Sequence, residues 1–291
     1  MLIKESFFES YPHLSIEKFE KSQMNWDELV AIYNDYNDSL DDFKDEAEHL
    51  FKKVINFSNV HSCKYRVKDP EHLIEKIIRK NIQGEEPINI ENYREKFHDL
   101  IGLRAIHLYK EDWEIINNQI YNKWSNNLIG RPYAYIRKGD SDEFISKFKG
   151  IEGKGEVRVH KFGYRSIHYI IAITHDHKKY YCELQVRTIF EEGWSEIDHD
   201  IKYPYNLDNP LYGEYLGILN RLAGASDEMA TMLKFIDRDQ KDKLQNIAEL
   251  KEESRVQKEE IRKLNERLKA KTFLGIIIAF FQKIYQFFRR K

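Results

Sequence analysis

The chain has 291 residues, enough for one or two domains with additional helices. Its 47 Lys and Arg residues and 49 Asp and Glu residues give a formal charge of −2, which excludes a protein bound to nucleic acid by overall charge alone. The two cysteines, Cys63 and Cys182, exclude a disulfide-rich secreted scaffold. The first residues lack the apolar run of a signal peptide, so a cytoplasmic location is expected.

The first part of the chain is predicted to alternate helices with one buried strand. Residues 1–58 show apolar side chains at helical spacing, and a further helix is expected after Pro70. A short helix over 88–100 leads into an apolar, β-compatible run over 100–109. Residues 111–124 again have helical spacing.

The central part contains a predicted hairpin. Residues 126–156 are rich in glycine and are expected to form a loop or an irregular insertion. Strands are predicted over 166–174 and 179–188, and the short connection between them indicates a β-hairpin. Helices are expected over 189–201 and again over 212–237.

The C-terminal residues differ in composition from the rest. Residues 241–270 are highly charged and predict a long helix. Their apolar residues do not keep a continuous seven-residue repeat, so a regular coiled coil is possible but not established. The tail, 271–291, is strongly apolar but is interrupted at Gln282 and Lys283, which is too early for a comfortable membrane span. Its basic end favours a helix at the membrane surface. The alternative is a helix that packs on this protein or on another copy of it.

Three cations stand close together in the sequence after residue 65. Arg66 and Lys68 lie two apart in an extended segment, so their side chains point to the same side. Lys76 lies on the helix that follows. Together they suit a polyphosphate, although surface cations are more often simply solvated.

An aspartate precedes the buried strand. Asp99 can ligate Mg²⁺, which prefers carboxylate oxygens and often bridges to substrate phosphates. Gly102 permits a close approach of the backbone. Equally, Asp99 could cap a turn and pair with Arg104.

The second strand of the hairpin carries a polar face. Glu183, Gln185 and Arg187 alternate with apolar residues and therefore share one side of the strand. This combination favours a functional site over a solvated face. We expect Glu183 to deprotonate a hydroxyl group, and Arg187 to hold phosphate or to orient Glu183.

Two His-Asp pairs, at 98–99 and 199–200, suggest a metal-dependent phosphohydrolase. Such an enzyme needs further His and Asp ligands on converging helices. The first pair instead precedes an apolar strand, so we do not favour this hypothesis.

Five segments in order resemble the synthetase domain of the RelA/SpoT alarmone synthetases: RVKDPEHLIEK, DLIGLRAI, GYRSIH, ELQVRT and WSEIDHDIKY. They extend over about residues 60–205, and their common order is much more specific than any one of them. The resemblance implies an α/β (α+β) nucleotidyltransferase-like fold, with a mixed β-sheet flanked by helices. It also implies transfer of the β,γ-pyrophosphate of ATP to the 3′-hydroxyl of GDP or GTP, which yields (p)ppGpp and AMP.

The resemblance assigns roles to individual residues. It implies that Arg66, Lys68 and Lys76 bind the ATP phosphates, and that Asp99 and Glu183 hold Mg²⁺. Glu183 would also activate the hydroxyl. The acceptor site would consist of four residues, with the first stacking on the base: Tyr164, His168, Gln185 and Arg187.

The sequence departs from the family where the acceptor base is read. Phe162 and His160 replace an Asn and a Lys that the guanine-using members usually carry, and Phe cannot read a base edge by hydrogen bonds. The acceptor therefore has alternatives: some small toxin-type relatives use adenine nucleotides or the 3′ CCA end of tRNA. A different class of function is a catalytically silent, membrane-tethered scaffold.

The predicted organisation has five segments. A helical segment, 1–58, precedes the synthetase domain, 59–205, and the helices that complete it, 206–240. A charged long helix, 241–270, and a membrane-associating tail, 271–291, follow. The resemblance is to a small, single-activity synthetase, whose relatives can form homo-oligomers.

Overall fold

A computed structural model describes residues 2–14, 16–21, 24–83, 87–152, 154–202 and 210–289. The chain divides into two compact units, Met1–Thr231 and Met232–Lys291. The first unit contains the β-sheet and most of the helices, while the second is the distal part of one long helix.

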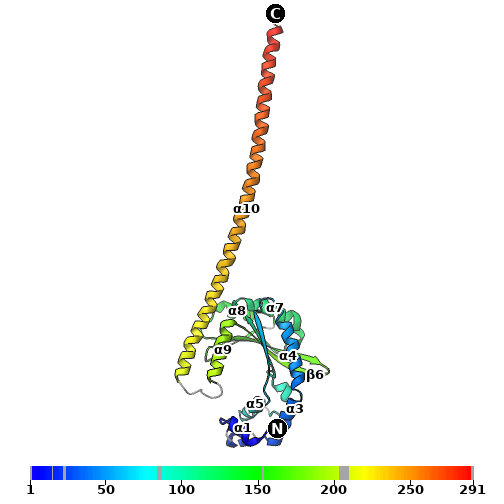
Figure 1. Ribbon diagram of the computed structural model, residues 1–291, viewed down its shortest axis with the longest axis vertical. Coiled ribbons are helices and arrows are strands. Elements are labelled where there is room, and N and C mark those ends of the chain that lie inside the picture. The colour runs from blue at the N-terminus through cyan, green and yellow to red at the C-terminus, as the bar shows by residue number, and fades with distance from the viewer. Residues whose placement is uncertain are drawn as a thin grey trace. The chain divides into compact units, whose positions relative to one another are not determined.

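A six-stranded sheet forms the centre of the first unit (Figure 1). Its strands are β1 (Ser62–Val67), β2 (Ile101–His107), β3 (Tyr133–Ile136), β4 (Glu156–Val159), β5 (Ser166–His175) and β6 (Lys178–Thr188), in the spatial order β1-β2-β6-β5-β3-β4. The β2–β6 and β3–β4 pairs are parallel, and the other pairs are antiparallel. The predicted mixed sheet and the β5–β6 hairpin are therefore confirmed.

Apart from α8, the helices occupy the places that the apolar spacing predicts. They are α1 (Lys4–Ser10), α2 (Ile16–Lys21), α3 (Trp26–Asp38), α4 (Leu40–Val54), α5 (Pro70–Ile82), α6 (Tyr93–Lys96), α7 (Asp112–Trp124), α8 (Asp142–Gly150), α9 (Ile189–Lys202) and α10 (Pro210–Arg289). A short 3₁₀ turn, Ser125–Asn127, follows α7. Figure 1 shows α4 and α9 on opposite sides of the sheet, so the predicted flanking helices are also confirmed.

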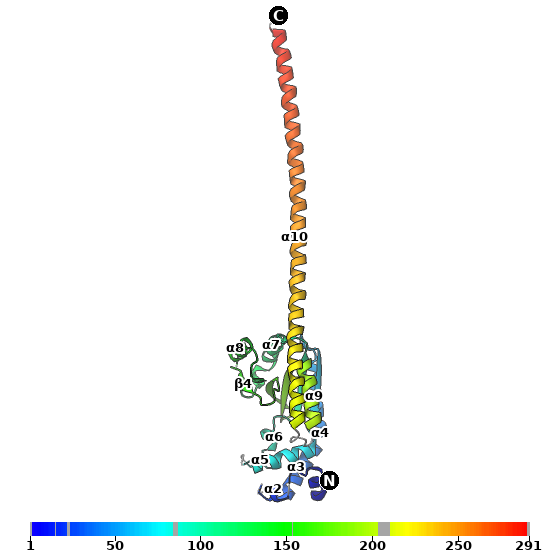
Figure 2. The same cartoon turned by 90° about the vertical axis from the view of Figure 1, so that its left-hand side faces the viewer.

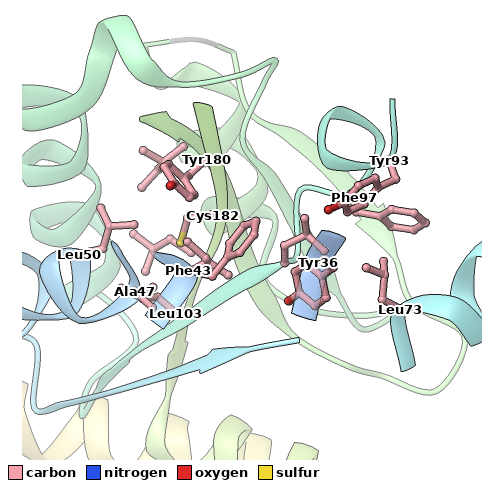
Figure 3. Close-up of a cluster of buried hydrophobic side chains, with 14 of the residues drawn as sticks. Tyr36, Phe43, Ala47, Leu50, Leu73, Tyr93, Phe97, Leu103, Tyr180 and Cys182 are labelled. Atoms are coloured by element: carbon pink, nitrogen blue, oxygen red, sulfur yellow. The ribbon is translucent and has the colours of Figure 1, made fainter. Parts of the chain in front are cut away.

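One face of the sheet is apolar because alternate residues of each strand point to the same side. Leu103 of β2 and Cys182 of β6 are completely or almost completely buried on this face. They lie with Phe43, Ala47 and Leu50 of α4 in the core cluster of Figure 3. This core holds β2 and β6 in place and fixes the side chains on their opposite face.

The opposite face of the sheet is polar and has a regular register. Arg66 of β1, Gly102 of β2 and Glu183 of β6 are direct neighbours across three strands. Two positions along the strands, Gln185 lies opposite His168 of β5. The polar residues predicted along β6 thus face cations from β1 and an imidazole from β5.

A capping box starts α9 at the end of β6. The Thr188 hydroxyl accepts from the Glu191 N–H at 3.1 Å, and the Glu191 carboxylate accepts from the Thr188 N–H at 2.8 Å. Trp194 of α9 donates to the Leu216 carbonyl of α10 at 2.9 Å. Figure 2 shows α9 beside the first turns of α10.

The predicted loop over 126–156 is wrong in part. It contains β3 and the nine-residue helix α8, which begins at a cap in which the Ser141 hydroxyl accepts from two backbone N–H groups. A four-residue strand and a short helix between glycines give too little periodicity to detect. The connection between the helices predicted over 189–201 and 212–237 falls almost entirely outside the described residues.

In the second unit, Met232–Lys291, the described residues continue α10. The helix predicted over 241–270 is confirmed, and the apolar side chains that it carries are exposed. Among the described residues, no helix has a stretch long and apolar enough to cross a membrane.

Asp227, on the part of α10 in the first unit, is fully buried. Burial and the nearby charge of Glu191 raise the pKa of this carboxyl group to about 7. Since the folded state binds the proton more tightly than the unfolded state, Asp227 stabilises the fold at low pH. That contribution is lost as the pH rises through about 7.

We therefore expect Asp227→Asn to raise the free energy of unfolding at pH 8, by about 4 kcal/mol at most. The difference from the unsubstituted protein should shrink as the pH falls toward 4. Urea unfolding followed by circular dichroism at both pH values measures it. An equal effect of the substitution at both pH values would contradict this account.

Candidate active site

Asp99 lies between two lysines at the start of β2. Its Oδ2 accepts from Lys68 Nζ at 2.9 Å and from Lys76 Nζ at 2.7 Å. Lys68 directly follows β1, and Lys76 is on α5. The Asp69 carboxylate caps α5, and Pro70 occupies its first turn, so the strand-to-helix turn that aims the two lysines at Asp99 is locally specified.

The two lysines keep Asp99 ionised. Burial alone would raise its pKa, but the charges of Lys68 and Lys76 hold the pKa well below the ordinary value. Burial lowers the pKa of Lys68 despite the ion pair. Two cations and one anion leave this cluster with a net positive charge, which suits a polyphosphate.

Arg66 extends the positive charge along the sheet. Its Cγ and Nε lie 3.3 Å from the point that a Cβ at Gly102 would occupy. Because residue 102 has no side chain, the Arg66 side chain can extend from β1 over β2 toward Glu183 on β6. Arg66 thus lies on the same side of the sheet as Glu183. Lys68 and Lys76 are near this carboxylate through Asp99, whose charge acts on Glu183.

Glu183 is held by hydrogen bonds from three strands. Its Oε1 accepts from the Tyr133 hydroxyl at 3.1 Å and lies 2.9 Å from His168 Nδ1. Its Oε2 accepts from Gln185 Nε2 at 2.7 Å. These contacts bring together β3, β5 and β6, so the carboxylate has a fixed orientation.

These contacts also set the charge of Glu183. Burial would raise its pKa, but the interactions with His168 and Gln185 outweigh it and lower the pKa to about 2. The charge of Asp99 acts in the opposite direction, which shows that the two carboxylates are near enough to repel each other. Glu183 is therefore an ionised carboxylate at neutral pH.

Tyr164 lies in a polar and aromatic cage. Its hydroxyl accepts from the Arg187 guanidinium at 3.0 Å and lies 3.2 Å from His168 Nε2. The guanidinium also lies 5.2 Å from the centre of the Tyr164 ring. Burial raises the pKa of Tyr164, which keeps the hydroxyl protonated.

Arg187 is only 1% exposed. Besides Tyr164 it contacts the Gln185 side chain and lies 3.4 Å from the Glu192 carboxylate of α9. It would have to exchange these partners to hold a phosphate. Its observed contacts orient Tyr164 and Gln185 instead.

The turn before β5 is closed by His160. The His160 Nδ1 accepts from the backbone N–H groups of Phe162 and Tyr164, each at 3.3 Å. Gly163 has φ +78°, a conformation that favours glycine. Phe162 is therefore turned outward, with 49% of its surface exposed.

Asn220 of α10 anchors this turn. Its Nδ2 donates to the Gly163 carbonyl at 2.9 Å, and its Oδ1 lies 3.4 Å from the Arg165 guanidinium. Arg165 also makes two hydrogen bonds, both of 2.8 Å, to Asp140. Arg165 is thus a structural residue, although it lies among the residues predicted to bind the acceptor.

Comparisons with known proteins relate a part of this chain to a protein family. Residues 65–208 match the family described as "Region found in RelA / SpoT proteins". This region of the chain belongs to the RelA/SpoT family. Two similar proteins, both from Bacillus subtilis (strain 168), are GTP pyrophosphokinase YwaC and GTP pyrophosphokinase YjbM. The first is 26% identical over 190 residues and the second 22% identical over 189 residues.

The compared regions include most of each relative. They cover 64% of this chain in both cases, and 79% of YwaC and 76% of YjbM. The crystal structure of small alarmone synthetase 1 from Bacillus subtilis superposes with a TM-score of 0.53 at 18% identity. It covers 71% of this chain and 99% of the other, which confirms the fold.

The candidate site has a donor set that fits Mg²⁺. Asp99 and Glu183 are both ionised, and carboxylate oxygens are the ligands that this hard cation prefers. Within the described ranges, no group of three or more His, Cys, Asp or Glu residues is placed to hold a metal ion. Two carboxylates suit Mg²⁺, which usually keeps several waters and shares substrate phosphates. The same absence gives no support to a His-Asp hydrolase centre in that part of the chain.

Two residues that contact the candidate site or its turn were not predicted from the sequence. Tyr133 contacts Glu183 directly, but it lies in the segment predicted to be a loop. The alternation of Tyr133 and Tyr135 with two apolar residues is its only local signal. Asn220 lies beyond the matched region, and no local pattern could relate it to Gly163.

Proposed function

We propose that this chain is an ATP-dependent pyrophosphokinase. It transfers the β,γ-pyrophosphate of ATP to the 3′-hydroxyl of GDP or GTP, giving (p)ppGpp and AMP. The observation that carries this proposal is the ionised Glu183, which is held by three donors and lies near enough to the Lys68–Asp99–Lys76 cluster for the charge of Asp99 to act on it. The names of the two relatives, both GTP pyrophosphokinases, support the same reaction.

The donor side of the site would neutralise and orient ATP. Arg66, Lys68 and Lys76 bind the phosphates, while Asp99 and Glu183 hold Mg²⁺. When bound, Mg²⁺ neutralises charge on the phosphate oxygens and fixes their geometry. Pyrophosphoryl transfer depends mainly on such positioning and charge stabilisation, so a preformed cation cluster is the main requirement.

The acceptor side would place the 3′-hydroxyl against Glu183. Tyr164 and His168 contact the acceptor nucleotide, with Gln185 and Arg187 supporting them. A carboxylate with a pKa of about 2 is a weak base. A loose transition state demands little proton removal before attack, so Glu183 can orient the hydroxyl first and accept its proton late.

The proposal is tested with purified protein, γ-labelled ATP and Mg²⁺. GDP, GTP, ADP, ATP and tRNA are offered in separate reactions, and the products are separated by chromatography. We expect label in GDP or GTP together with release of AMP. Label in no acceptor would overturn the pyrophosphokinase proposal and favour the catalytically silent scaffold.

A second acceptor class has its own structural support. Phe162 is exposed at the turn where a guanine reader is expected, and Lys161 lies 5.3 Å from the centre of its ring. An aromatic ring beside a cation can stack on any base and pair with a backbone phosphate. Because stacking does not select guanine, this feature is equally compatible with an adenine nucleotide or the 3′ end of tRNA, the acceptors of the toxin-type relatives. Label in one of those acceptors alone would replace the leading substrate.

The C-terminal tail supports a location at the cytoplasmic face of the membrane. After Glu266 the chain contains no acidic residue, while basic residues flank the apolar run on both sides. The described apolar side chains of this run are mostly exposed on α10. An exposed apolar surface with flanking cations fits anionic lipid headgroups and the acyl boundary beneath them.

We expect the full chain to sediment with vesicles that contain phosphatidylglycerol, and a chain ending at Ala270 to remain in the supernatant. Binding should weaken in vesicles of phosphatidylcholine alone, because the electrostatic attraction is then absent. The truncated chain should retain its transferase activity, which shows that the catalytic unit is folded. Equal sedimentation of the two chains would exclude the tail as the anchor. A full chain that forms a dimer in solution, with a truncated chain that is a monomer, would instead favour pairing of the tail with a second copy.

A further inference from the structure

Tyr133 links β3 to Glu183, the carboxylate proposed to act in catalysis. It lies directly opposite His168 in the β3–β5 register. The two rings are stacked, with centres 4.9 Å apart and planes inclined by 25°. The hydroxyl of the same tyrosine donates to Glu183 Oε1 at 3.1 Å.

The other side of the Tyr133 ring is covered by Arg158. The guanidinium carbon of Arg158 lies 4.0 Å from the ring centre. Arg158 belongs to β4, which pairs in parallel with β3, and its own position is fixed by two hydrogen bonds to Glu156. The ring therefore lies between a cation and an imidazole, which restricts its rotation.

The contacts of Glu183 are distributed unequally between its two oxygens. Each carboxylate oxygen can accept about two hydrogen bonds. Both acceptor positions of Oε1 are occupied, one by the Tyr133 hydroxyl and one by His168 Nδ1. Oε2 accepts one hydrogen bond, from Gln185 Nε2, and can accept a second interaction.

We propose that Tyr133 is a positioning residue for pyrophosphoryl transfer. It shares Oε1 of Glu183 with His168 and so presents Oε2 to the metal ion or to the acceptor hydroxyl. This inference rests on the proposed function. It adds a residue of β3 to the site and gives the two carboxylate oxygens different tasks.

The test removes only the hydroxyl. Tyr133→Phe keeps the ring between Arg158 and His168 but leaves Oε1 with one donor, so the carboxylate can rotate. We expect kcat to fall about 10- to 100-fold. The KM values for ATP and for the acceptor should remain within about threefold, because the residues that bind the two nucleotides are unchanged. Thermal unfolding should remain close to that of the unsubstituted protein.

Two further variants make the test specific. Tyr65→Phe is the matched control, because Tyr65 lies on β1, packs against Phe51 and is partly exposed. It should leave kcat unchanged. Replacing Tyr133 by 4-aminophenylalanine restores a donor at the same position on the ring, and most of the lost rate should return.

The outcomes separate this inference from the proposed function. If the unsubstituted protein labels no acceptor, the proposed function fails. If it is active and Tyr133→Phe keeps kcat within twofold, the positioning role is wrong. A loss seen only as a raised acceptor KM would also overturn it, since Tyr133 would then bind substrate. A rate that stays low with 4-aminophenylalanine would show that the donor is not what matters.

Discussion

Glu183→Gln is expected to lower kcat by about 1,000-fold or more while leaving ATP affinity within about threefold. Gln has the same shape as Glu, but it carries no charge to hold Mg²⁺ or to receive the proton. Its amide NH₂ group would also face the donors that now surround the carboxylate. Steady-state rates with labelled ATP, together with equilibrium binding of a non-hydrolysable ATP analogue, measure the two effects.

Glu28→Gln is the matched control, because Glu28 is exposed on α3 and is not part of the site. It should behave like the unsubstituted protein in both measurements. A Glu183→Gln protein that retains even a tenth of the rate would show that another group takes the proton and that Asp99 holds the metal without help.

Asp99→Asn should separate metal binding from phosphate binding. The substitution removes the anion that Lys68 and Lys76 share, so binding of Mn²⁺ with nucleotide should be lost and kcat should fall at least about 100-fold. In the absence of metal, ATP should bind at least as tightly as before, because both lysines become available to its phosphates. Electron paramagnetic resonance of Mn²⁺ and calorimetry of ATP binding provide the two readouts.

Leaving two lysines without their shared anion should also lower the free energy of unfolding, by about 3 kcal/mol. The Asp27→Asn protein, changed at an exposed position in the first turn of α3, should show none of these effects. Metal-free ATP binding that weakens after Asp99→Asn would contradict the assignment of Lys68 and Lys76 to the phosphates.

Local patterns were sufficient to predict that the two lysines proposed to bind the ATP phosphates converge. Lys68 and Lys76 lie on consecutive elements joined by a turn with an Asp cap and a proline, so their convergence is encoded within about ten residues. The strict alternation along β6 likewise predicts that Glu183 and Gln185 share a face. Their hydrogen bond follows from that spacing.

The environment of Glu183 could not be predicted in the same way. Its three donors come from three strands, and one of them lies in a strand of only four residues. Which tyrosine faces His168 depends on the β3–β5 register, and that register is a property of the assembled sheet. The pKa of about 2 depends on these contacts. The alternation along β6 therefore predicts where the Glu183 carboxylate lies but not that it is a weak base.

The anchor of the Gly163 turn lies 57 residues further along the chain. All six strands precede Asn220, so a chain emerging during synthesis can pair its whole sheet before the turn receives its last support. The two lysines that share Asp99 lie at the end of β1 and on α5, whereas the turn proposed to contact the acceptor gains its anchor only when α10 packs beside it. The RelA/SpoT match ends at residue 208, so a chain cut to the matched residues would lack the side chain that anchors this turn.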